Sequence, residues 1–195
     1  MSTYSEYLNF AKDIAKYAGE IMLKYFSKDN GEKYKGDKTI VTLADTEINS
    51  YLINRVKEKY PSHAVDGEEE QFGESNYKWV CDPVDGTAMY ARHIPVAVFS
   101  LALVIDGKPI VGVVYDPFTD SLYTAIKGEG AYKNNEKISV NNYVLDDIRT
   151  VCHCDMWSKA KYNVCKVFEE LRKKTRLNDI GSITRASCCV ATGDY

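Results

Sequence analysis

Two carboxylates, Asp82 and Asp85, follow a short apolar run, and a glycine and a threonine come directly after them. The apolar run suits a buried strand, and Pro83 cannot donate to a sheet ladder, so the strand is predicted to stop near Asp82. Gly86 and Thr87 then suit the start of a helix, whose first N–H groups and positive dipole end attract anions. Carboxylates bind hard cations and helix N-termini bind phosphate, so these residues predict a metal-dependent site for a phosphorylated substrate.

A second group of acids lies a short way upstream. Glu68, Glu69 and Glu70 follow Gly67 and a brief apolar stretch at residues 64–65. Three adjacent glutamates are most often a solvated turn. If the two apolar stretches form neighbouring strands that end at the same sheet edge, however, both acid groups meet there, and this arrangement favours a shared site.

The elements that must position these acids begin with two helices. Residues 4–26 carry apolar side chains at helical spacing, which predicts an amphipathic helix. Residues 39–41 form a brief extended piece. Thr42 and Asp45 have the spacing of a capping box that opens a second helix, running to about Tyr60 before Pro61. Asp45 therefore has a structural explanation as the first-turn acid of that helix.

The middle of the chain has the pattern of an antiparallel meander. Asp106-Gly107 is a hairpin turn between two of its strands. The predicted strands are residues 96–105, 109–115, 121–126, 130–132, 137–140 and 148–153. Helices are predicted at residues 158–174 and 182–192.

Composition excludes several classes of function. The 195 residues carry 25 basic and 28 acidic side chains, a net charge of −3, which argues against a nucleic-acid polymer as partner. The longest apolar run, residues 94–105, is too short to span a bilayer. Cys152-His153-Cys154 has no second pair at zinc-site spacing, so the six cysteines are expected to be free thiols in a reducing cytoplasm.

Taken together, these segments resemble the inositol monophosphatase family of magnesium-dependent, lithium-sensitive phosphatases. The residues 82–87, D-P-V-D-G-T, are similar to that family's D-P-[IL]-D-G-T signature, and residues 67–69 to its G-E-E. Residues 40–45, 112–115 and 127–131 also match its V-T-x-x-D, G-V-V-Y and K-G-x-G-A segments.

The resemblance implies a layered αβαβα fold of the α+β, sugar-phosphatase type, with an antiparallel sheet meander between flanking helices, formed by residues 1–195 as a single domain. Residues 181–193 resemble the family's G-[ST]-A…A-T-G segment. Family members continue beyond it with a W-D-x-A-A motif that supplies a further metal-ligating aspartate. We therefore expect this chain to lack the usual C-terminal segment, either as a fragment or as a naturally short form. The resemblance also implies a homodimer.

The resemblance assigns roles to residues of the site. The family binds two or three Mg²⁺ ions, of which one is expected here. The metal ligands would be Glu68, Asp82, the Val84 carbonyl and Asp85, with Asp82 bridging two ions. Asp45 and Thr87 would orient and deprotonate the attacking water, and Glu69 would order the waters on the metal. The substrate would contact Asp85, Gly86, Thr87, Gly181, Ser182 and Ile183.

Rival interpretations differ in class. The aspartyl-phosphate route of haloacid-dehalogenase-like enzymes needs D-x-D-x-T, and the acids here are one residue further apart. A non-catalytic module that binds metal or phosphate remains an alternative, because it needs the same carboxylates. The expected substrate is a small phosphorylated metabolite similar to inositol monophosphate, with fructose-1,6-bisphosphate, histidinol phosphate and a 3′-phosphonucleotide as alternatives.

Overall fold

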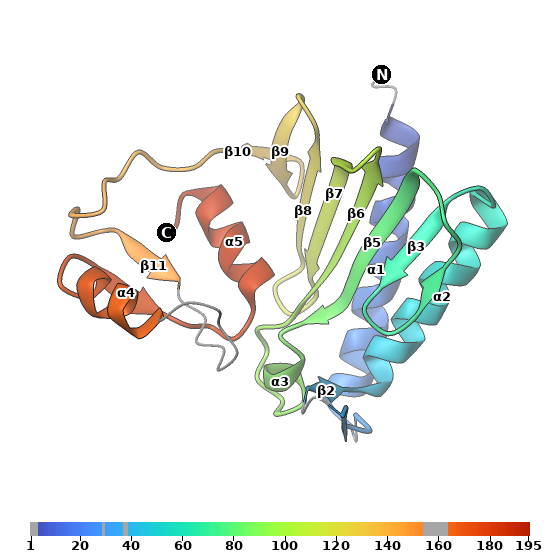
Figure 1. The fold of residues 1–195 in the computed structure, drawn as a ribbon, viewed down its shortest axis with the longest axis horizontal. Coiled ribbons are helices and arrows are strands. Elements are labelled where there is room, and N and C mark those ends of the chain that lie inside the picture. The colour runs from blue at the N-terminus through green and yellow to red at the C-terminus, as the bar shows by residue number, and fades with distance from the viewer. Residues whose placement is uncertain (1–3, 29, 37–38, 154–163) are drawn as a thin grey trace.

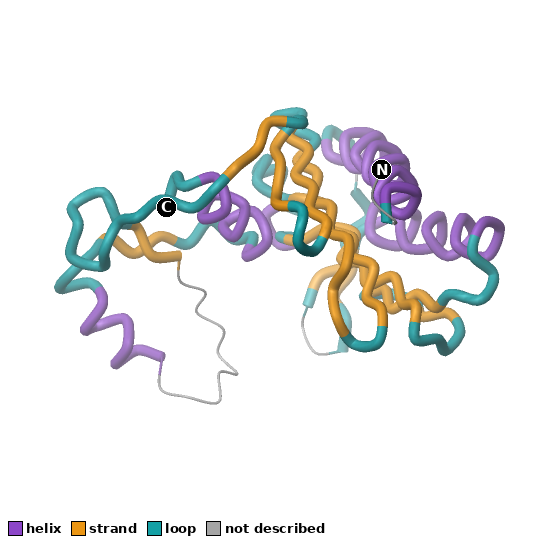
Figure 2. Tube along the Cα trace, turned by 90° about the horizontal axis from the view of Figure 1, so that it is seen from above, coloured by secondary structure: helices purple, strands orange, loops and turns teal. Residues whose placement is uncertain are grey.

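The computed structural model describes residues 4–28, 30–36, 39–153 and 164–195, and it consists of a central sheet with two long helices on one face (Figures 1 and 2). Helix α1, Ser5–Phe26, buries one stripe of side chains against the sheet, as predicted. Helix α2, Leu43–Lys59, begins with the predicted capping box, in which the Thr42 N–H donates to Asp45 Oδ2 over 2.8 Å.

The central sheet has eight strands in the order β10-β9-β8-β7-β6-β5-β3-β4. Their bounds are Ala64–Gly67 (β3), Gln71–Phe72 (β4), Tyr77–Asp85 (β5), Val98–Ile105 (β6), Lys108–Asp116 (β7), Ser121–Ile126 (β8), Gly130–Lys133 (β9) and Glu136–Ile138 (β10). From β5 to β10 each strand pairs antiparallel with the next, which confirms the predicted meander. Both residues of its predicted hairpin turn, Asp106 and Gly107, have positive φ angles.

Strands β3 and β5 are neighbours and run parallel, with Gly67 opposite Cys81. Glu68 follows the last residue of β3, and Asp82 and Asp85 lie in the last four positions of β5, so both acid groups lie at the same edge of the sheet. The prediction that the acids converge at one edge is confirmed.

The prediction that Pro83 ends its strand near Asp82 is wrong. Strand β5 continues to Asp85, but its register against β6 shifts between the pairs Asp82–Ser100 and Asp85–Val98. The strand advances three positions where β6 advances two, which is a bulge. Pro83 lies inside this bulge, where no ladder hydrogen bond is needed from its nitrogen.

Shorter elements surround the sheet. Strands β1, Lys33–Tyr34, and β2, Ile40–Val41, form a small antiparallel pair, and β11, Val151–His153, pairs parallel with β12, Arg176–Asn178. The helices are α3, Thr87–Tyr90, α4, Val164–Leu171, and α5, Ile183–Thr192. Helix α5 lies between the sheet and an outer part made of β11, α4 and β12 (Figure 1).

Several elements differ in their bounds from the predicted ones. Within the predicted helix 158–174, residues 158–163 lie outside the described residues, and α4 ends at Leu171 because a turn follows. The predicted strand 148–153 is reduced to β11. Strands β1, β4 and β12 were not predicted. The helix at 182–192 is confirmed, with Ser182 as its N-cap.

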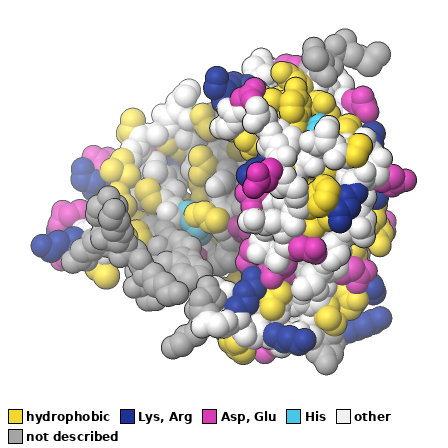
Figure 3. Space-filling view, turned by 45° about the vertical axis from the view of Figure 1, so that its right-hand side comes forward, with side chains coloured by type: hydrophobic (Ala, Val, Ile, Leu, Met, Phe, Trp, Pro, Cys, Tyr) yellow, Lys and Arg dark blue, Asp and Glu magenta, His cyan; other side chains and the backbone are white. Residues whose placement is uncertain are grey.

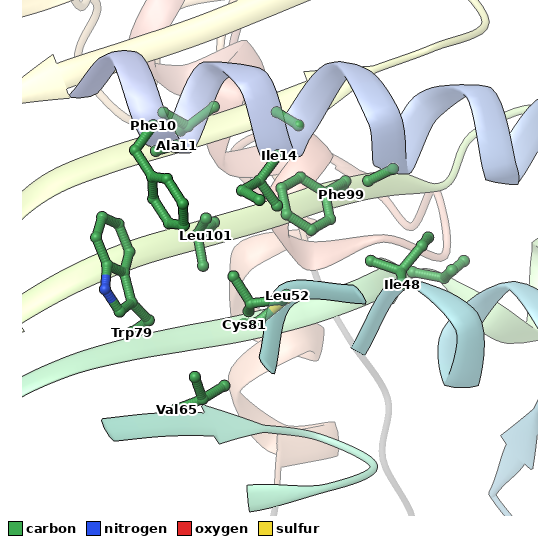
Figure 4. Packing of buried hydrophobic residues seen from close by; sticks show 14 of the residues in the cluster. Phe10, Ala11, Ile14, Ile48, Leu52, Val65, Trp79, Cys81, Phe99 and Leu101 are labelled. Atoms are coloured by element: carbon green, nitrogen blue, oxygen red, sulfur yellow. The ribbon is translucent and has the colours of Figure 1, made fainter. Parts of the chain in front are cut away.

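The main core lies between the sheet and the helices α1 and α2. In Figure 4, Trp79 and Leu101 of the sheet pack toward Phe10 and Ile14 of α1, while Cys81 points to Leu52 of α2. Trp79 and Phe99 have no exposed surface. This core fixes β5 and therefore the start of the acid-bearing segment. Along the described ranges, no helix combines the length and apolarity that crossing a bilayer requires.

Candidate active site

Acids of both groups, Glu68, Asp82 and Asp85, line a cavity of about 580 Å³ at the edge of the sheet. Its wall includes the end of β5, helix α3, the start of α5, strand β2 and His153 of β11. Figure 3 shows a hollow in this part of the surface with acidic side chains gathered along its border. Nine predicted site residues line the cavity: Glu68, Asp82, Val84, Asp85, Gly86, Thr87, Gly181, Ser182 and Ile183. The other two, Asp45 and Glu69, do not line it.

Asp82 lies where β5 bulges, and its carboxylate accepts a hydrogen bond from the Val84 N–H at 3.1 Å. Burial raises the pKa of Asp82 to about 8, and the nearby charges of Asp85, Glu68 and Asp45 add to the shift. Gathering these acids without a cation is therefore costly, because like charges in a desolvated site oppose one another.

Asp85 is buried, and its carboxylate is held by donors from the start of α5. Thr184 donates its hydroxyl to Asp85 Oδ2 over 2.8 Å and its N–H to Oδ1 over 3.3 Å. The Ser182 hydroxyl donates to Asp85 Oδ1, while the Ser182 oxygen also accepts the Arg185 N–H as an N-cap. Thr184 was not among the predicted site residues, although its place two residues after an N-cap serine puts it in the same helical turn.

The turn that carries the glutamates is held by Asn49 of α2, a residue that was not among the predicted site residues. Asn49 Oδ1 accepts the N–H groups of Glu69 and Glu70 at 3.3 and 3.4 Å, and its Nδ2 donates to the Glu70 carbonyl at 3.0 Å. A Cβ on Gly67 would lie 2.1 Å from Asn49 Oδ1, so this close approach requires glycine. Asn49 is fully buried and gives no sequence signal beyond its position on the inner face of α2.

Lys35, next to β1, binds the two glutamates at the cavity edge. Its Nζ lies 3.1 Å from Glu68 Oε1 and 2.5 Å from Glu69 Oε1. The ammonium therefore offsets part of the negative charge that a metal ion would otherwise meet. Glu69 faces Lys35 and lies outside the cavity lining.

Asp45 is nearly inaccessible, at 1% exposure, at the first turn of α2. Its Oδ2 accepts both the N–H and the hydroxyl of Thr42, while no partner of Oδ1 is found among the described residues. Burial raises the pKa of Asp45 to about 7, partly countered by the Thr42 hydrogen bonds. The Thr87 hydroxyl donates to the Val84 carbonyl at 2.8 Å, so the hydrogen-bonding chain between Thr87 and Asp45 stays a prediction.

The residues at the cavity suit a hard cation by donor type. Glu68, Asp82, Asp85 and the Val84 carbonyl offer the oxygen ligands that Mg²⁺ takes. The raised pKa of Asp82 shows that burial and the neighbouring acids disfavour its ionisation when no cation is bound. Within the described part of the chain, no three His, Cys, Asp or Glu side chains are already clustered as a metal site. Glu68 would have to exchange Lys35 for the ion.

Comparison with known proteins agrees with this geometry. The family model described as "Inositol monophosphatase family" matches residues 3–195. Inositol monophosphatase 3 of Solanum lycopersicum is 36% identical over 143 residues, covering 70% of this chain and 53% of that protein. Inositol monophosphatase 1 of Homo sapiens is 33% identical over 203 residues, covering 97% of this chain and 73% of that protein. The chain spans about half the length of the tomato relatives it matches.

Solved structures share the architecture. The IMPase of Thermotoga maritima aligns with a TM-score of 0.86 at 26% identity, over 96% of this chain and 73% of that one. The suhB protein of Bartonella henselae aligns with a TM-score of 0.89 at 24% identity, over 96% of this chain and 75% of that one, which shows the fold alone. The fold thus defines the class of protein, a layered α/β structure shared with these solved structures. The chain belongs to the inositol monophosphatase family, whose members are metal-dependent phosphatases.

Proposed function

We propose that this chain carries the active site of a magnesium-dependent phosphomonoesterase that hydrolyses a small phosphorylated metabolite such as inositol monophosphate. The observation that supports this most directly is the single cavity in which Glu68 meets Asp82 and Asp85 beside the first residues of α3 and α5. Its volume suits a metabolite of a few rings at most.

Glu68, Asp82, the Val84 carbonyl and Asp85 would hold Mg²⁺. The ion, when bound, would neutralise charge on the transferring phosphate and lower the pKa of water. The carboxylates would bind and place the ion, and Glu69 would keep its ion pair with Lys35 when Glu68 turns to the ion.

The remaining roles fall to residues that touch substrate or move a proton. Gly86 and Thr87 present the first N–H groups of α3, which have no partners within the helix and suit phosphate oxygens. Asp45, with a pKa raised to about 7 and one unpartnered oxygen, suits a proton acceptor near neutral pH, acting through Thr87. Asp85 would contact the alcohol side of the substrate, together with Gly181, Ser182 and Ile183.

The substrate within this class is the finer part of the proposal. A relative from Aquifex aeolicus is named fructose-1,6-bisphosphatase/inositol-1-monophosphatase, and a structure 28% identical is titled as SaIMPase-II with 2′AMP bound. The first of these names supports a sugar bisphosphate as an alternative to test beside inositol monophosphate. The 3′-phosphonucleotides and histidinol phosphate remain alternatives from the sequence resemblance alone. We also propose a cytoplasmic location, which the thiols of Cys81, Cys165, Cys188 and Cys189 suit because they form no disulfide. The proposal of a homodimer rests on the family resemblance.

The decisive experiment measures phosphate release and metal binding in parallel. We expect the protein to release phosphate from inositol monophosphate with Mg²⁺, and Asp82→Asn and Asp45→Asn to lose at least about 100-fold of that activity. Binding of Mn²⁺ or Mg²⁺ without phosphate release from any of the named substrates would instead establish the non-catalytic alternative. Absence of both would refute the assignment of the metal ligands.

A further inference from the structure

Helix α5 is attached to the sheet through a second carboxylate, Asp116, at the end of β7. Asp116 is 2% exposed and forms an ion pair with Arg185 in the first turn of α5. It also accepts the Phe118 N–H at 2.9 Å and the Thr119 hydroxyl at 2.7 Å. Asp116 is therefore fully engaged within its own turn, and Arg185 adds the compensating charge.

The two carboxylates that α5 contacts lie at the same edge of the sheet. Strands β5 and β7 flank β6 and both pair antiparallel with it, so Asp85 and Asp116 end strands that run in the same direction. Ser182 and Thr184 bind the first carboxylate and Arg185 binds the second. One turn of α5 thus bridges two strand ends.

The Arg185 backbone links the two attachments. Its N–H donates to the Ser182 oxygen at 3.2 Å, and the Ser182 hydroxyl donates to Asp85. The position of the Arg185 backbone therefore helps to orient the Ser182 hydroxyl, which donates to Asp85. A buried carboxylate paired with arginine resists separation, because parting them leaves an uncompensated charge in a desolvated place.

We propose that Arg185 and Asp116 are positioning residues that hold the start of α5 against the sheet, so that Ser182 and Thr184 fix the carboxylate of Asp85 for cation binding. This inference rests on the proposed function for the role of Asp85, whereas the attachment of α5 is a separate, directly measurable claim. Neither residue touches the cavity; both act through the α5 donors.

The accessibility of two cysteine thiols shows whether α5 is attached to the sheet, and it can be measured without an assay of activity. Cys188 of α5 is 8% exposed and faces the sheet across an apolar cavity of about 470 Å³. Cys81 of β5 is 4% exposed and points into the core toward α2 (Figure 4). Cys81 is also among the residues that line this cavity, but it belongs to the core cluster. Release of α5 is therefore expected to expose Cys188 while Cys81 stays buried, whereas global unfolding exposes both thiols.

The experiment compares Arg185→Met, Arg185→Lys and Asp116→Asn with the unmodified protein, using thiol labelling quantified for each cysteine by mass spectrometry. Arg149→Gln is the matched control, since Arg149 forms an exposed ion pair with Asp147 away from α5. We expect Arg185→Met to raise the labelling rate of Cys188 about 10-fold while Cys81 stays protected, and Arg185→Lys to restore most of the protection.

Metal binding gives the second readout. Partners that orient a ligand typically account for 10–100-fold in metal affinity, so Arg185→Met is expected to raise the Mn²⁺ dissociation constant about 10-fold, with Arg149→Gln unchanged. Unchanged Cys188 labelling in Arg185→Met would overturn the attachment, and increased labelling with unchanged Mn²⁺ affinity would overturn the positioning role. If Arg185→Met does not fold, Arg185→Lys and Asp116→Asn decide the same two points. Absence of phosphatase activity in the unmodified protein would refute the proposed function and leave the labelling result valid.

Discussion

The carboxyl of Asp82 stays protonated at a pH at which an ordinary aspartate is ionised, since its pKa is about 8. The folded protein without metal therefore binds more protons than the unfolded chain between roughly pH 4 and 8. Stability from this group is fully present below the unfolded pKa and is lost as pH rises through the folded pKa. Asp45, with a pKa of about 7, contributes in the same direction.

We accordingly expect the melting temperature of the metal-free protein to fall as pH rises from 5 to 8.5. Thermal unfolding followed by circular dichroism measures it, with Asp82→Asn as the comparison, because the amide cannot ionise and should flatten much of the slope. Equal slopes in both proteins would show that Asp82 is ionised throughout this range. Saturating Mg²⁺ should reduce the fall, since the ion favours the charged carboxylates.

A second residue-scale prediction concerns Gly67. Its Cβ in Gly67→Ala would overlap Asn49, so we expect destabilisation of about 1–3 kcal/mol by overpacking and weaker Mn²⁺ binding from a displaced Glu68. Gly112→Ala is the control, because a Cβ there meets nothing within 4 Å. Urea unfolding compares the two variants, and a neutral Gly67→Ala would contradict the contact with Asn49.

At the scale of elements, the antiparallel pair formed by β1 and β2 places a lysine beside the acids. Lys35, which follows β1, forms ion pairs with Glu68 and Glu69. Lys35→Met removes this competing charge, so we expect Mn²⁺ to bind about 3-fold more tightly to the metal-free protein. Calorimetry tests this, with Lys33→Met as the control on the exposed strand of the same pair. Weaker binding in Lys35→Met would mean that Lys35 orders Glu68 and does not compete for it.

The elements also show which features a single sequence can predict. The helices α1 and α2 and the hairpin meander follow from local periodicity, capping and turn residues, and those predictions are confirmed. The bulge at Pro83 was missed because a proline can either end a strand or sit in an irregularity, and the local pattern is the same. Strands of two or three residues, such as β1 and β12, are too short to show any period.

The residues of the site also fall into two groups, those that the sequence predicts and those that it does not. Adjacent strand ends bring Glu68 to Asp82, and that proximity follows from the order of motifs along the chain. The sequence did not predict the roles of Asn49, Thr184 and Lys35. Each of them contacts a site residue that is far away in the sequence. Such contacts depend on the packing of α2, α5 and the β1–β2 pair, which local patterns do not encode.

At the scale of the molecule, the attachment of α5 changes what is expected of Asp85. A lone acid beside other acids should be replaceable by asparagine without loss of stability, but Asp85 accepts bonds from Ser182 and Thr184. We therefore expect Asp85→Asn to weaken Mn²⁺ binding at least about 10-fold and also to expose Cys188 to thiol reagents. Cys81 labelling is the control, and continued protection of Cys188 would show that Arg185 and Asp116 hold α5 unaided.

The bond between Ser182 and Asp85 joins residues 97 positions apart, whereas the strands of the meander pair with their neighbours through short turns. Closing a loop of that length costs about 2 kcal/mol more in chain entropy than closing one of ten residues. The sheet can therefore fold and bury its aromatic side chains before α5 arrives. During synthesis the acids emerge and take their places first, while the donors that fix Asp85 follow later. Among the described elements, the part of the pocket that α5 supplies therefore depends on a long-range contact that the sheet itself does not need.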